Sequence, residues 1–407
     1  MPEKYLNEFI AYSVVFKTGL IGLTTYLYLD TRPQRIAEDE QGGGKVSAGG
    51  DDEIYRRLLS LFFAIAYTVS GFLMAYNWNF MWLDAIIMLP FVLTGLENLV
   101  FHGKPFLYCI ALAIAIYSNF YLSIMICIFL VIYFVYLYLI KFAGALRHGW
   151  GALWRFAFFS LLAGGIVSVM LIPEIYVLLG NDFSRMSVVR EESNYFPVLD
   201  VLGRHCISVM GEHTLAHWPN IYCGTSVFLF VPLYVFQEKT PVRRRFGMLV
   251  IAGFMLLSFC NPFLDWLWHG MKYPQGLPAR ESFLYCLWVV IICHECAVNL
   301  NFDEKSHKYR ILGAYVFAVL SLLFIEKSVH AEWMEEKLVW LTLVFVTIYA
   351  VIFYKLYSWE KGDMRSLALF LLLCTIVLEA QINAVDTNAV TMNVPEYNME
   401  PQSIRAL

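Results

Sequence analysis

The sequence predicts an all-α, polytopic transmembrane helical bundle, and three observations carry this prediction. The chain is 59% hydrophobic and only 15% charged, whereas soluble globular proteins carry about 25% charged residues. Apolar runs of bilayer-crossing length, roughly 17–25 residues, recur along nearly all of it. Its lysines and arginines gather in alternate connections between these runs. The net charge of −4 is close to neutral and gives no indication of a nucleic-acid partner.

We expect about twelve spans, because a helix crosses a hydrocarbon layer of about 30 Å with roughly 20 residues. Taken in order along the chain, the expected spans are 7–29, 57–76, 81–101, 104–120, 121–140, 153–172, 224–238, 246–264, 280–300, 311–326, 338–357 and 366–384.

The basic residues predict the orientation of these spans. Short cytoplasmic loops are enriched in Lys and Arg, and the enriched connections are 30–56, 141–152, 239–245 and 301–310. The opposite connections are therefore expected outside the cell. This divides the chain into a membrane domain, 1–384, which includes an extracellular loop at 173–223, and an extracellular tail, 385–407. The amino terminus also falls outside without a signal peptide, which predicts that the chain is the middle of a longer protein.

A polar stretch at the outer boundary holds the first candidate site residues. Asn77, Trp82 and Asp84 lie between two apolar runs, and an ionisable group there usually faces a cavity, a partner or a substrate. If a helix continues through this stretch, Asn77, Met81, Asp84 and Met88 share one face. Asp84 could bind a cation, accept hydrogen bonds from a sugar or act as a general acid or base. The structural alternative is a pair with a neighbouring helix, for example with Arg280.

A short loop at 268–283 holds the second group of candidates. It is dense in Pro and Gly, which fix its backbone and hold His269, Lys272 and Arg280 in place. A rigid cationic loop at the membrane surface suits a lipid-linked phosphate, because arginine binds phosphate through two parallel hydrogen bonds. The alternative is that Lys272 and Arg280 only extend their charged ends to the interface.

Two further polar segments are expected on the same side. Asn119 and Tyr121 lie at a turn between two spans and suit either stacking on sugar rings or anchoring in lipid headgroups. Asn220 and Tyr222 end the 173–223 loop. Cys293-His294-Glu295-Cys296 has the spacing of half a zinc site, but no second pair of ligands follows, and its residues are interpreted as buried small hydrophobes.

At these residues the chain resembles the bacterial YfhO membrane-protein family. The resemblance covers nearly the whole chain, and its motifs occur in the family's order. They are Ser70-Gly71-Phe72, Asn79-Phe80-Met81-Trp82-Leu83-Asp84-Ala85, Leu89-Pro90, Gly95-Leu96-Glu97, Ser118-Asn119-Phe120-Tyr121, Pro219-Asn220-Ile221-Tyr222-Cys223-Gly224, Trp268-His269-Gly270 and Pro278-Ala279-Arg280-Glu281-Ser282-Phe283.

The resemblance implies a polytopic glycosyltransferase of the GT-C type in the bacterial cell membrane. Such an enzyme moves a sugar from a polyprenyl-phosphate carrier to an extracellular acceptor, which is thought to be teichoic acid in Gram-positive members. Such enzymes place an acidic residue, as the catalytic base or a metal ligand, in a first extracellular loop that precedes the region matching Met1, so the chain is expected to lack that loop and the family's C-terminal extension. A divalent cation is compatible with this chemistry, but the resemblance assigns no metal ligand within the chain.

On this interpretation Asp84 is the catalytic candidate within the chain, where it would bind the sugar or support the active-site acid. Arg280, His269 and Lys272 would hold the carrier phosphate, and Asn77, Trp82, Asn119, Tyr121, Asn220 and Tyr222 would bind the rest of the substrate. One departure concerns the arginine, which the family flanks with aromatic residues but which here lies between Ala279 and Glu281. The alternative functions are a transporter or flippase of lipid-linked sugar and a non-catalytic membrane scaffold. A transporter would place ionisable groups near the bilayer midplane, whereas here they gather at one face.

Overall fold

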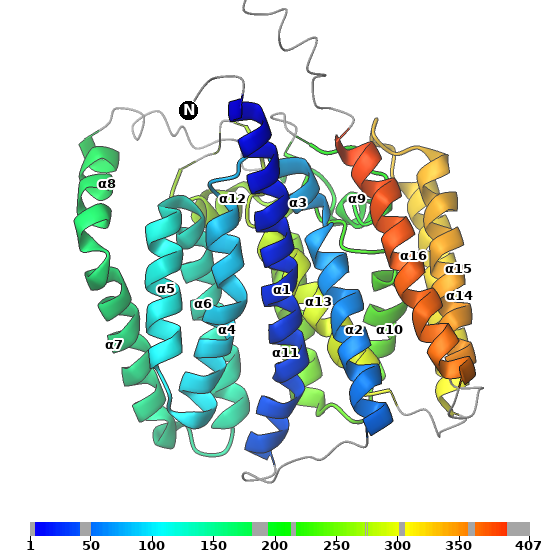
Figure 1. Cartoon of the computed structure of the whole chain (residues 1–407), viewed down its shortest axis with the longest axis horizontal. Coiled ribbons are helices and arrows are strands. Elements are labelled where there is room, and N and C mark those ends of the chain that lie inside the picture. Colours follow the sequence, from blue (N-terminus) through cyan, green and yellow to red (C-terminus); the bar gives the residue numbers. More distant parts are fainter. Residues whose placement is uncertain are drawn as a thin grey trace, which may run out of the picture.

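The structure is a computed structural model that describes residues 5–40, 50–180, 194–212, 217–272, 274, 276–300, 306–356 and 363–388. Within these ranges every regular element is a helix, which confirms the all-α prediction (Figure 1). The helices are α1 (Leu6–Glu40), α2 (Gly50–Thr68), α3 (Gly71–Tyr76), α4 (Leu83–His102), α5 (Phe106–Ser118), α6 (Phe120–Lys141), the 3-10 turn η2 (Leu146–Gly149), α7 (Trp150–Ile166), α8 (Ser168–Gly180), α9 (Val198–Gly203), α10 (Val227–Val235), α11 (Val242–Cys260), α12 (Pro262–Trp268), α13 (Ser282–Val298), α14 (Ser306–Ser328), α15 (Glu336–Leu356) and α16 (Asp363–Asn388).

The long helices stand side by side, and the short helices α3, α9 and α12 gather at one end of the bundle (Figure 1). We call that end the upper end, and the end with the connection between α6 and α7 the lower end. Helix α13 lies at the centre, because nearly all of its residues are buried. It packs against α2 and α10. A helix that is apolar all round is suited to such a central position.

Six helices in the described part of the chain are long and apolar enough to cross a membrane, and up to eight spans result if each of two bent helix pairs counts as one. The chain is therefore a multi-pass helical membrane bundle, but the expected number of twelve spans is not confirmed. Several expected spans are shorter or broken. The expected span 224–238 contains only α10, and 57–76 is divided into α2 and α3.

Two breaks bend the chain sharply, and the mean hydropathy of the sequence around them does not reveal either break. Helices α7 and α8 meet at 81°, and α11 and α12 meet at 105°. The second bend has a local cause. The residue before a proline is disfavoured in helical conformation, and Asn261, which precedes Pro262, is extended with φ −103° and ψ 119°. Of the expected tail, only the part up to Asn388 falls within the described residues, where it continues α16. The glycine-rich segment 41–49 lies outside them.

A buried network of charged side chains joins α1 to α4, α11 and α13. Arg32, which is 3% exposed, lies 3.1 Å from Oε1 of Glu97 and 2.7 Å from Oε2 of Glu295. Each carboxylate has further donors: Tyr28, Tyr133 and Arg35 for Glu97, and Arg244 and Tyr234 for Glu295. The interpretation of Cys293-His294-Glu295-Cys296 as buried is correct, but its two polar residues are not inert, because His294 also pairs with Ser60.

Candidate functional site

The bend between α11 and α12 builds the candidate site at the upper end. The Asn261 side chain accepts hydrogen bonds from the backbone N–H groups of Phe263 and Leu264, at 3.0 and 3.2 Å. This caps the first turn of α12 and satisfies donors that would otherwise have no partner. The helix then carries Asp265 inward, and His269 follows one turn later. Both side chains are buried, at 3% and 2% exposure.

Asp265, His269 and Glu281 form a compact buried cluster. One potential ligand atom from each of the three lies within 4.8 Å of the others. Nδ1 of His269 is 3.0 Å from Oδ1 of Asp265 and 2.8 Å from the backbone oxygen of the same residue. The Tyr195 hydroxyl donates to Oδ2 of Asp265 at 2.9 Å. The cluster therefore joins two acids and an imidazole from both sides of one loop.

Glu281 is the most constrained member of the cluster. Its residue is 0% exposed, and within the described residues neither carboxylate oxygen has a hydrogen-bond partner. The loop that delivers it has strained backbone: Met271, Leu277 and Ala279 have φ values of 65°, 51° and 48°. Residues other than glycine rarely adopt this left-handed region, and such strain concentrates at functional sites.

Arg280 lies beside the cluster, between two aromatic rings. Its guanidinium carbon is 4.7 Å from the centre of the Tyr121 ring and 5.6 Å from that of Trp82. Nε and Nη2 donate to the backbone oxygens of Leu277 and Gly276, at 2.9 and 3.0 Å. The Tyr121 ring is in turn 6.2 Å from the His269 ring. The structure thus brings together four of the predicted site residues. Lys272 lies in the same loop and is partly exposed.

Asp84 has a different neighbour from the one considered from the sequence. Its Oδ2 lies 2.6 Å from Nζ of Lys17, so its ion pair is with α1 and not with Arg280. The condition under which Asn77 and Asp84 would share one helix face is not met, because α3 ends at Tyr76 and α4 begins at Leu83. Asp84 falls in the first turn of α4, where the helix dipole favours a negative charge. Asn77 follows the end of α3 and is partly exposed.

The remaining predicted residues make hydrogen bonds within the protein. Asn119 caps α6 by accepting from the backbone of Leu122 at 2.9 Å. Asn220 accepts from Arg204 at 2.9 Å and from the backbone N–H of Glu212. The Tyr222 hydroxyl donates to the buried Glu379 at 2.7 Å. These bonds position the upper-end segments, and a direct role in substrate binding stays a prediction for all three residues.

Sequence reasoning missed Asp265 and gave Glu281 no role in a site. A signal was present for both. Asp265 and His269 are four residues apart, the spacing that places two side chains on one face of a helix. Glu281 was noted as a departure from the family pattern. A third missed residue is Arg204, which is 3% exposed. Burial lowers the pKa of this guanidinium to about 10, and it donates to the backbone oxygens of Pro219 and Met210.

The comparisons with known proteins agree with this architecture. The family model described as "Bacterial membrane protein YfhO" matches residues 1–403 of the chain. The chain belongs to the YfhO family. A relative described as "Uncharacterized protein YfhO", from Bacillus subtilis (strain 168), is 22% identical over 295 residues, which are 72% of this chain and 31% of the relative. The chain thus covers less than a third of that relative's length. No solved structure matches.

Membership of the YfhO family confirms the resemblance seen in the sequence motifs. Several of those motifs have clear structural counterparts in the described residues. Gly95 lies at a close contact, since a Cβ there would be 2.4 Å from the backbone nitrogen of Tyr108, and Glu97 lies in the buried charge network. The family motif at Gly95 and Glu97 therefore contributes to the packing of the bundle. The candidate functional site is the loop at Arg280.

Proposed function

We propose that this protein is a membrane glycosyltransferase that moves a sugar from a polyprenyl-phosphate carrier to a cell-envelope polymer, such as teichoic acid, on the extracellular side. The observation that carries the proposal is the arginine at the upper end. Arg280 is held between Tyr121 and Trp82 by two backbone hydrogen bonds, beside buried acidic groups and an imidazole.

The arginine is suited to the phosphate of the carrier. A guanidinium has five N–H donors in a planar fork that matches phosphate oxygens. Nε and Nη2 of Arg280 are fixed by the loop, which orients the group before the substrate arrives. When the sugar leaves the carrier, this preoriented charge stabilises the negative charge on the departing phosphate.

The sugar and its acceptor would lie toward α3 and α4. Trp82 and Tyr121 supply aromatic faces, while Asn77 and Asp84 supply polar groups. The Asp84 side chain is 41% exposed, whereas Glu281 is fully buried. A hydroxyl that arrives from water can therefore reach Asp84 more easily, and we assign Asp84 the role of general base. Lys17 would position its carboxylate through the 2.6 Å ion pair.

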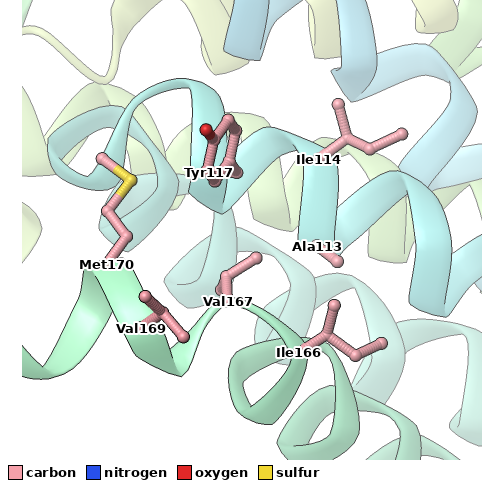
Figure 2. A pocket seen from close by; sticks show the side chains of 7 residues that line it. All are labelled: Ala113, Ile114, Tyr117, Ile166, Val167, Val169 and Met170. Carbon is pink, nitrogen blue, oxygen red and sulfur yellow. The ribbon is translucent and has the colours of Figure 1, made fainter.

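An apolar cavity supplies a place for the prenyl chain. A cavity of about 540 Å³ lies between the end of α5 and the bend of α7 and α8 (Figure 2). It is lined by Ala113, Ile114, Tyr117, Ile166, Val167, Val169 and Met170. Tyr117 precedes Tyr121 by four residues across the turn between α5 and α6. A carrier whose phosphate meets Arg280 could thus lay its first isoprene units against this apolar wall.

The test is sugar transfer from undecaprenyl-phosphate-sugar to teichoic acid by the purified protein. We expect Arg280→Gln to lower transfer by about 10²- to 10³-fold, the usual effect of losing one preorganised donor to a developing anion. Lys337→Gln is the matched control, because Lys337 is a 72% exposed cation. If Arg280→Gln and Asp84→Asn together leave transfer unchanged, the site is wrongly assigned. Flux of lipid-linked sugar across liposomes without transfer would support a flippase instead. The absence of both activities would support a scaffold.

A further inference from the structure

We propose that Nε2 of His269 and the carboxylate of Glu281, with Asp265 orienting the imidazole, form a binding site for a divalent transition-metal ion, Mn²⁺ or Zn²⁺. Asp265 lies on α12, His269 directly follows that helix and Glu281 directly precedes α13. One candidate ligand atom from each residue lies within 4.8 Å of the others. Metal bonds to nitrogen and oxygen are about 2.0–2.2 Å long, so two ligands of one ion lie up to about 4.4 Å apart. Small side-chain rotations would close the cluster around an ion.

Unsatisfied buried atoms indicate that something is bound there. Both carboxylate oxygens of Glu281 and Nε2 of His269 are buried, and none has a hydrogen-bond partner among the described residues. A buried polar atom without a partner costs about 1–3 kcal/mol, and more if it is charged. These three atoms belong to two members of the same compact cluster, which is the arrangement expected around an ion.

The hydrogen bonds of His269 leave the correct nitrogen available. Nδ1 is held by Asp265, at 3.0 Å from Oδ1 and 2.8 Å from the backbone oxygen, and it therefore carries the proton. Nε2 then presents a lone pair. A histidine that binds a metal almost always donates its other N–H to a carboxylate or a backbone carbonyl in this way. Tyr195, which donates to Asp265 at 2.9 Å, would hold that carboxylate in turn.

The charge and the ligand types select the ion. Two carboxylates and a neutral imidazole sum to −2, which a divalent cation offsets. Imidazole suits Zn²⁺ and related transition metals, and carboxylate suits Mn²⁺, whereas Mg²⁺ and Ca²⁺ prefer oxygen ligands only. Within the described residues, the other charged or titratable groups near the cluster include Tyr195 and Tyr121, Arg280, whose guanidinium is anchored in the adjoining loop, and His217, with Nδ1 3.9 Å from Oδ2 of Asp265.

The ion deepens the proposed function, because when bound it would add positive charge beside the arginine that we assign to the carrier phosphate. Binding itself does not rest on that proposal, and it can be measured without turnover. If the protein shows no sugar transfer, metal binding can still be measured. If the protein binds no metal, the effect of Arg280 on transfer can still be tested. The two failures are therefore distinguishable.

The experiment measures bound metal in the purified, chelator-treated protein after equilibration with MnCl₂ or ZnCl₂. Elemental analysis gives the stoichiometry, and the paramagnetic resonance of Mn²⁺ or X-ray absorption of zinc reports the ligands. We expect about one ion per chain, bound by nitrogen and oxygen, with binding abolished in Glu281→Gln and His269→Ala. Tyr195→Phe should weaken binding by about 10–100-fold, the usual effect of removing a group that orients a ligand.

Two controls keep the proposal falsifiable. Glu336→Gln removes an acid at the start of α15, outside the cluster, and should bind like the unmodified protein. In metal-free samples Glu281→Gln should unfold at the same temperature as the unmodified protein or a higher one, because it removes an uncompensated buried charge. Added metal should then raise the unfolding temperature of the unmodified protein alone. A folded protein that binds no metal, or a Glu281→Gln variant that binds it equally well, overturns the proposal.

Discussion

Nζ of Lys17 lies 2.6 Å from Oδ2 of Asp84, and this ion pair ties α1 to the first turn of α4. Lys17 also donates to the backbone oxygen of Phe80 at 3.1 Å. The ammonium group of Lys17 and the carboxylate of Asp84 thus neutralise each other at the upper end. Both side chains are partly exposed, at 20% and 41%. The pair can therefore position Asp84 without removing it from water.

The two partners should differ in their effects on catalysis. If Asp84 is the general base, Asp84→Asn lowers kcat by about 10²–10⁴-fold. Lys17→Met should lower it far less, because Lys17 only positions the carboxylate. Thermal unfolding of the single and double variants should give a coupling energy of about 0.2–1 kcal/mol, as for other partly exposed pairs. Equal losses of kcat in both single variants would contradict the assignment.

The buried network should be essential to stability. Glu97→Ala removes a carboxylate that is 0% exposed and that pairs with Arg32 and Arg35. Breaking a buried ion pair in this way costs about 3–5 kcal/mol. Glu53→Ala is the control, because Glu53 forms an exposed pair with Arg57 four residues later on α2 and should cost less than about 0.5 kcal/mol. Thermal unfolding in detergent separates the two. Similar melting temperatures would show that the network contributes little.

Gly95 should tolerate no side chain. A Cβ there would lie 2.4 Å from the nitrogen and 2.5 Å from the Cα of Tyr108, so Gly95→Ala must separate α4 from α5. Small residues permit such close approach of membrane helices, and overpacking costs about 1–3 kcal/mol. Gly164→Ala is the matched control, since nothing lies within 4 Å of its added Cβ in the last turn of α7. That variant should keep or slightly raise the melting temperature. Equal destabilisation of both would argue against the contact.

The cap of α12 should control the geometry of the cluster. Asn261→Ala removes the acceptor for two backbone N–H groups, at a cost of about 0.5–2 kcal/mol. Because α12 carries Asp265 and precedes His269, we also expect weaker metal binding in this variant. Asn261→Asp restores an acceptor and should recover both properties. The measurements are thermal unfolding and titration with Mn²⁺. Unchanged values in Asn261→Ala would show that Pro262 alone sets the bend.

The sequence predicts the helical class and part of the site, because both follow from local chemistry. Apolar runs predict helices, and in the Pro- and Gly-rich loop Arg280 and His269 both lie near the Tyr121 ring, while their role in binding stays a prediction. The number of spans was not predictable in this way, because hydropathy does not detect a break at one residue such as Asn261.

Long-range pairs lie further beyond local reasoning. Arg32 and Glu295 are separated by 263 positions, and nothing near either residue specifies the other. The same limit explains why Asp84 was considered with Arg280 and not with Lys17, and why Asp265 and Glu281 were not recognised as one cluster. Each residue of these pairs can be recognised in the sequence as charged or polar, but which residues contact each other depends on the fold.

The position of Arg32 between two acids also orders events during synthesis. Its first partner, Glu97, is made 65 residues later, whereas Glu295 is made 263 residues later. At about 5–20 residues per second these intervals are about 3–13 s and about 13–53 s. A buried guanidinium without a carboxylate partner is strongly destabilising, so α1 and α4 have reason to associate early. The second half of the protein then arrives at a helix pair in which Arg32 can still pair with Glu295 of α13.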